Sequence, residues 1–168
     1  MNDMESNRIY DRAKAVEYAH EWAKGRNPAY YNFDGIGGDC TNFVSQCLFA
    51  GCGIMNYTRD TGWYYRSPND RAAAWSGVEY LYRFLVANKK AGPYGTEQPI
   101  HDFFHNVREG DIIQLSYDGQ VFGHSLFVVG VRPEILVAHH SSVNCDNRPL
   151  TTYEYARVRW IHIDGVRT

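Results

Sequence analysis

The sequence predicts an α+β fold, in which helices from the first half of the chain pack on an antiparallel sheet formed by the second half. Two observations predict it. Apolar residues recur at helical spacing up to about residue 90, whereas from Gly110 onward short apolar segments alternate with turns. Helices followed by consecutive strands are typical of an α+β domain. The 168 residues contain no repeat or long linker, so one domain over residues 1–168 is expected.

The helices are predicted from apolar stripes. One runs from about Asp11 to Lys24, and a second begins at Asp39 or Cys40 and ends at Gly51. A third follows Ser76, because Ser76 and Glu79 have the spacing of a capping box. The pair Glu79 and Arg83 lies at helical spacing and is expected on a solvated face.

Four strands are predicted in the second half. They cover residues 111–117, 120–131, 134–141 and 156–163. Asp118-Gly119 predicts a hairpin between the first two strands, and Arg132-Pro133 a turn between the second and third. Short turns between consecutive strands indicate antiparallel pairing.

Composition argues against several classes of protein. The net charge is −2 and the Lys and Arg residues are scattered, so no nucleic-acid partner is expected. No apolar run is long enough to span a membrane, and the first residues lack the apolar region of a signal peptide. The chain as written is therefore expected to be cytoplasmic, with secretion still open if a leader was removed, and monomeric.

The four cysteines are too few for a disulfide scaffold, and their spacing matches no common zinc pattern. No metal or cofactor is expected. His101 and His105 have the spacing of a helical metal pair, but Phe103 and Phe104 between them are expected in the core. The segment Trp63, Tyr64 and Tyr65 has two open interpretations, a wall of a substrate groove or ordinary packing under a long loop.

Cys40 is the strongest candidate for a nucleophile. It follows Gly37, Gly38 and Asp39 and opens a predicted helix, where backbone N–H groups and the helix dipole favour a thiolate. Asp39 is expected to cap this helix, and the same N–H groups suit the oxyanion of an acyl intermediate. The alternative is a free cysteine buried on a core stripe. Cys47 and Cys52 are interpreted as packing residues, and Cys145 as a loop residue without an evident role.

His124 is the candidate base. If the following turn centres at Arg132, His124 faces His140 across the hairpin, and His139 points to the other side of the sheet. Two paired imidazoles would allow one to take the thiol proton while the other fixes its tautomer. Three other polar residues remain open for that third role: Asn144, Asp146 and Asn147.

Several blocks of the sequence resemble the putative amidase domain family of bacteria. They are "GGDCTNFVSQCLFAG", "GHSLFVVGV" and "HHSSVNCDNRPL", together with "YDRAKAVEYAHEWAKGRNPAYYNFD" and "NYTRDTGWYY". The family is similar in turn to the NlpC/P60 and papain-like cysteine hydrolases, so the resemblance implies a papain-like fold. It also implies Cys40 as nucleophile, His124 as general base and His140 as the third residue. By the same likeness, Tyr30 or Tyr31 would line the site.

The resemblance implies a cysteine hydrolase of amide or peptide bonds that needs no metal, acting on a peptide or a peptidoglycan fragment. Two alternatives stay open. An acyltransferase or deamidase would use the same residues and differ only in what attacks the thioester. A non-catalytic binding module would keep the fold without the chemistry.

Overall fold

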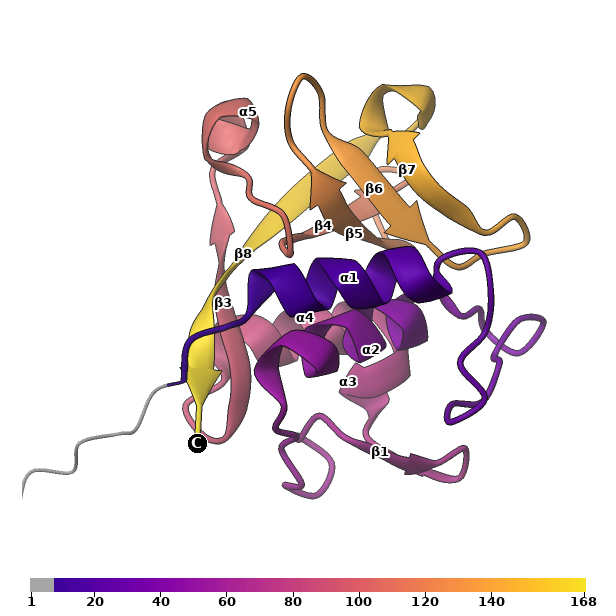
Figure 1. The fold of residues 1–168 in the computed structure, drawn as a ribbon, viewed down its shortest axis with the longest axis vertical. Coiled ribbons are helices and arrows are strands. Elements are labelled where there is room, and N and C mark those ends of the chain that lie inside the picture. The colour runs from indigo at the N-terminus through magenta and orange to yellow at the C-terminus, as the bar shows by residue number, and fades with distance from the viewer. Residues whose placement is uncertain (1–7) are drawn as a thin grey trace, which may run out of the picture.

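The computed structural model describes residues 8–168 and shows helices packed against an antiparallel sheet (Figure 1). The helices are α1 (Arg12–Trp22), α2 (Cys40–Cys52), α3 (Ala73–Ser76), α4 (Val78–Ala87) and α5 (Phe103–Asn106), with short 3₁₀ turns at Ile100–Asp102 and Leu150–Thr152. A small hairpin pairs β1 (Tyr65–Ser67) with β2 (Asp70–Arg71). The α+β architecture predicted from the sequence is therefore confirmed.

Six strands form the main sheet in the order β3-β8-β4-β5-β6-β7, and every pair is antiparallel. Their bounds are β3 (Gly92–Gln98), β4 (Ile112–Ser116), β5 (His124–Gly130), β6 (Leu136–His139), β7 (Cys145–Pro149) and β8 (Arg157–Arg167). The four predicted strands correspond to β4, β5, β6 and β8, which occupy the centre. The two edge strands, β3 and β7, were not predicted. The β4–β5 connection spans residues 117–123, so it is longer than the expected tight hairpin.

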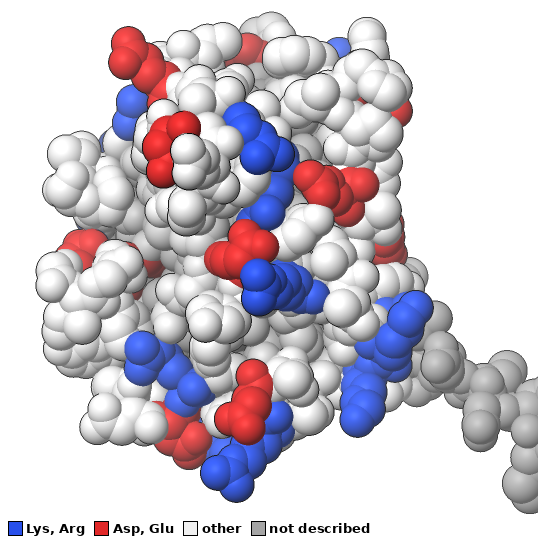
Figure 2. Space-filling view, turned by 180° about the vertical axis from the view of Figure 1, so that it is seen from behind, with Lys and Arg blue, Asp and Glu red and all other residues white. Residues whose placement is uncertain are grey.

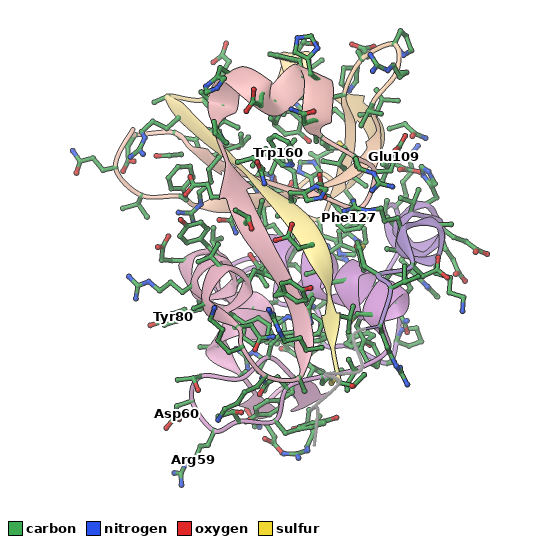
Figure 3. The ribbon with its side chains drawn as sticks, turned by 90° about the vertical axis from the view of Figure 1, so that its left-hand side faces the viewer. Arg59, Asp60, Tyr80, Glu109, Phe127 and Trp160 are labelled. Carbon is green, nitrogen blue, oxygen red and sulfur yellow. The ribbon has the colours of Figure 1, made fainter. Side chains whose placement is uncertain are left out.

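The sheet is buried on both faces because its central strands alternate between two apolar clusters. Phe127 packs with α1 and α2, whereas its neighbour Leu126 packs with Trp160 on the face covered by α5. Figure 3 shows Trp160 toward α5 and Phe127 toward the helical layer. Burial on both faces explains why β4 is apolar or fully buried at every position.

Two local expectations are wrong. Ser76 does not cap the third helix, because it ends α3 and Gly77 is the N-cap residue of α4. Its hydroxyl instead accepts a hydrogen bond from Arg71 Nε.

Glu79 contacts Arg83 at 3.5 Å as expected, and also Arg159 at 2.9 Å. Phe103 is buried, but Phe104 is 70% exposed, so only the first of these two rings belongs to the core.

The open question about Trp63 is answered by burial. Trp63 is fully buried against Trp75 and donates a hydrogen bond from Nε1 to Ser45 Oγ, so it packs in the core. Tyr65 also contacts the Trp75 ring, and Tyr64 packs at a tilt against Tyr57. These aromatic residues hold the β1–β2 hairpin onto α2 and α3.

The surface carries both signs of charge. On the face shown in Figure 2, Lys and Arg residues are interspersed with Asp and Glu, and no large region has a single sign. Within residues 8–168, no helix has the length and apolar character needed to cross a bilayer.

Candidate active site

Cys40 is the first residue of α2 and lies beside the start of β5. Its sulfur is close to the backbone amide of Ser125, the residue that follows His124. The neighbouring Thr41 hydroxyl is 2.9 Å from Ser125 Oγ, which fixes the beginning of the helix against the strand. Residues more than 80 positions apart in the chain are thereby brought to one place.

Cys40 and His124 line the same open cavity, of about 550 Å³. Its remaining walls come from residues 34–35, 37–39, Gly123 and residues 140–142. Gly37 and Gly38 adopt φ angles of 84° and 94°, a conformation that favours glycine, and no atom lies within 4 Å of where their Cβ atoms would be. The approach to the Cys40 sulfur is therefore free of side chains on this wall.

Asp39 does not cap α2 as expected. Its carboxylate makes no cap hydrogen bond, and instead accepts from the Phe33 backbone N–H at 2.9 Å and from Asn42 Nδ2 at 2.8 Å. Its second oxygen contacts Arg26 and His140. The Asp39 side chain therefore takes none of the backbone N–H groups of the first turn of α2, which are the kind of donor that can hold an oxyanion.

The predicted pairing of His124 with His140 is wrong. In the observed register Phe127 is opposite Ala138 and Val128 opposite Val137, and the register shifts by one residue between Val128 and Gly130. Alternation then places His139, not His140, on the face of His124. His124 Nε2 lies 2.7 Å from His139 Nδ1.

His140 points to the helical face and holds neighbouring segments together. Its Nδ1 is 2.8 Å from Asp39 Oδ2 and 3.0 Å from Arg26 Nη1, and its Nε2 donates to the Trp22 carbonyl at 2.8 Å. The ring stacks on Phe43 of α2 with centroids 4.1 Å apart. His140 thus fixes the residue before Cys40.

The other candidates for a third residue have different partners. Asn144 Oδ1 accepts hydrogen bonds from Arg26 and the Ser141 amide, and Asp146 pairs with His20. Asn147 occupies the bulged edge strand with φ of 52°. Tyr30 packs on Trp75, and Tyr31 packs on Phe33, so neither ring belongs to the cavity around Cys40.

Burial controls the protonation of this site. The pKa of the Cys40 thiol is raised because burial outweighs the stabilising Ser125 amide and Thr41 hydroxyl, and the Asp39 charge adds to the increase. Burial also lowers the pKa of His124 to about 4, with a further contribution from the Arg148 charge. At neutral pH the site therefore holds a neutral thiol and a neutral imidazole, in contrast to the thiolate expected from the helix start.

His139 shares this neutral character. Burial, followed by the charges of His124, Arg148 and His140, lowers its pKa to about 3. Its Nε2 is buried without a hydrogen-bond partner among residues 8–168. His124 Nδ1 has no partner there either, and the His124 residue lines the cavity that Cys40 borders.

The sequence could have indicated part of what it missed. An isolated glycine within a strand, here Gly130, is a signal for a bulge, and a bulge changes which histidine faces His124. Arg26, which joins Asp34, Asp39 and Asn144, follows a helix end and has no local signature of this role.

This α+β protein brings a thiol at a helix start and an imidazole at the start of β5 to one open cavity. Residues 9–163 match the family model described as "Putative amidase domain", and the chain belongs to that family. It is 34% identical over 123 residues to "Uncharacterized protein YhbB" of Bacillus subtilis (strain 168). That alignment covers 71% of this chain and 37% of the relative, so the chain spans well under half of the relative's length. No solved structure matches.

Proposed function

We propose that the protein is a cysteine amidase that hydrolyses amide or peptide bonds through Cys40, His124 and His139. The observation that carries the proposal is the cavity that Cys40 and His124 both line, because it brings a thiol at a helix start and an imidazole to one open space. Membership in the amidase family supports the same class of reaction.

In the first step, the Cys40 proton moves to His124 Nδ1 while the sulfur bonds to the carbonyl carbon of the substrate. The carbonyl oxygen becomes an oxyanion, which accepts hydrogen bonds from the start of α2. The C–N bond then breaks, and His124 gives its proton to the leaving nitrogen. Water then adds to the thioester carbonyl and gives a proton to His124. The C–S bond breaks, the carboxylic acid is released, and the sulfur takes the proton from His124 to restore the thiol.

His139 is proposed as the residue that sets the tautomer of His124. For Nδ1 to accept a proton, Nε2 must carry the hydrogen, and His139 Nδ1 at 2.7 Å is its acceptor. Papain-like and NlpC/P60 hydrolases are similar in placing the nucleophile at a helix start and the base on a strand. We therefore extend the proposal to a papain-like arrangement and to peptides or peptidoglycan stem peptides as substrates.

Replacing the nucleophile tests the proposal. Cys40→Ala should abolish release of amine from peptide amides and peptidoglycan fragments, measured with a fluorescent amine reagent. Cys145→Ala removes a half-exposed thiol outside the cavity and should retain the wild-type rate.

Intact-mass spectrometry of a quenched reaction supplies a second readout, since wild-type enzyme should carry an acyl adduct on Cys40. Turnover that survives in Cys40→Ala, or an adduct on another residue, would overturn the proposal.

A further inference from the structure

Arg148 lies on the same face of the sheet as the imidazole pair. In the β6–β7 register it is opposite Val137, two residues before His139. Its guanidinium carbon is 3.9 Å from the centre of the Tyr153 ring, and that ring is 5.5 Å from the His139 ring. Arg148 of β7, Tyr153 after the Leu150–Thr152 turn, His139 of β6 and His124 of β5 thus form a continuous row.

The charge of Arg148 has no counterion. Its Nε and Nη2 donate to the Thr152 hydroxyl and carbonyl at 2.8 and 3.2 Å, and no carboxylate lies within 4.0 Å among residues 8–168. By contrast, Arg26 and Arg12 each contact a buried carboxylate. Burial and the Cys40 charge raise the pKa of the exposed Tyr117 hydroxyl, and the Arg148 charge lowers it.

An unpaired cation at this position opposes the proposed chemistry. The acylation step puts a positive charge on His124, and Arg148 makes that charge less favourable. An anionic group bound at Arg148 would remove the repulsion at the moment when His124 becomes charged. Binding of an anionic substrate at Arg148 would then itself make His124 a stronger base.

We infer that Arg148 binds a carboxylate of the substrate close to the scissile amide, so that the enzyme prefers amides with a free carboxylate over their neutral carboxamide analogues. The inference rests on the proposed function for its catalytic meaning, but a preference of Cys40 for an anionic reagent can be measured without turnover. Arg148 and Cys40 belong to β7 and α2, so the ligand would extend across the β5–β6 end of the sheet.

The test compares two alkylating reagents of nearly equal size, anionic iodoacetate and neutral iodoacetamide. Rates of modification of Cys40 are measured by peptide mass spectrometry, and the iodoacetate-to-iodoacetamide ratio is divided by that of free glutathione. We expect this normalised ratio to be about ten in the wild type, which corresponds to one favourable ion pair of modest strength. It should fall to about one in Arg148→Gln and remain raised in Arg148→Lys.

Arg132→Gln is the matched control, since Arg132 is exposed at the opposite end of the β5–β6 hairpin, and it should keep the wild-type ratio. A wild-type ratio of one, a ratio unchanged by Arg148→Gln, or a Cys40 that neither reagent modifies would each overturn the inference. Because the labelling needs no substrate, an inactive but selectively labelled enzyme would contradict the proposed function while leaving the anion site intact.

Discussion

The two ring nitrogens of His124 have different surroundings, and this difference predicts the effect of replacing His139. His139→Leu removes the acceptor at 2.7 Å from Nε2, so the ring can rotate or adopt the wrong tautomer. We expect kcat to fall about 100-fold with little change in KM, in the range of losses found for general acid–base catalysis. His139→Asn offers an amide oxygen in place of the imidazole nitrogen and should recover a large part of the activity.

His140 provides the contrast at the same scale. Because it contacts Asp39, Trp22 and Phe43 rather than His124, His140→Leu should lower the melting temperature along with activity. His139→Leu should lower activity with the smaller effect on the melting temperature. Equal kcat losses in His139→Leu and His139→Asn would argue that His139 does not set the tautomer.

At the scale of elements, α1 and α2 cross at Gly51, and this contact predicts an unusual response to alanine. A Cβ atom at Gly51 would lie 2.6 Å from Tyr10 Cε1 and 2.8 Å from the Asp11 carbonyl oxygen. The helix propensity of alanine favours Gly51→Ala by about 1 kcal/mol, but the backbone oxygen cannot move aside cheaply. We expect net destabilisation of about 1–3 kcal/mol, as for other overpacked cores.

Chemical denaturation measures this effect, with Gly25→Ala as the control. At Gly25 the added Cβ would meet only Trp22 at 3.9 Å, an ordinary contact, so its unfolding midpoint should stay near the wild-type value. A midpoint for Gly51→Ala at or above that of the wild type would mean that the two helices can separate slightly without cost.

The elements that could be predicted from the sequence are those buried on both sides. Central strands such as β4 and β5 are mostly apolar and fully or almost fully buried, so their residue types identify them. In the main sheet the missed strands are the two edges, where β3 contains Pro93 and β7 carries Asp146 and Arg148. Edge strands tolerate proline and charge because one of their sides has no partner strand, so their sequences look like loops.

The candidate site divides in the same way. Cys40 was predicted as a candidate because its local sequence marks a helix start, and His124 because it is a lone histidine in an apolar predicted strand. Which of His139 and His140 faces His124 depends on one register shift near Gly130, a long-range property of the hairpin. A one-residue change of register moves every later side chain to the opposite face, which is why the partner of His124 was predicted wrongly.

At the scale of the whole molecule, the buried imidazole pair should make stability depend on pH above the range where carboxylates titrate. The pKa of His124 is lowered to about 4 in the folded protein, against about 6.5 in an unfolded chain. Between these values the unfolded state binds a proton that the folded state does not, so stability falls as pH decreases. The contribution of His124 to stability is fully lost once the pH is below the pKa of His124 in the folded protein. Asp39 and Asp111 also have lowered pKa values, but an ordinary carboxyl group titrates near about pH 4, so these two residues affect stability mainly below about pH 5.

Lowering the pH from 7 to 5 should therefore reduce the free energy of unfolding by about 2 kcal/mol through His124 alone. Urea denaturation at the two pH values measures this difference, and His124→Gln should show a smaller loss because it has no group to protonate. His101→Gln is the control, since His101 is exposed beside Asp102, and its loss should equal that of the wild type. If His124→Gln lost as much stability as the wild type, His124 would take up its proton at the same pH in the folded and the unfolded protein, and burial would not lower its pKa.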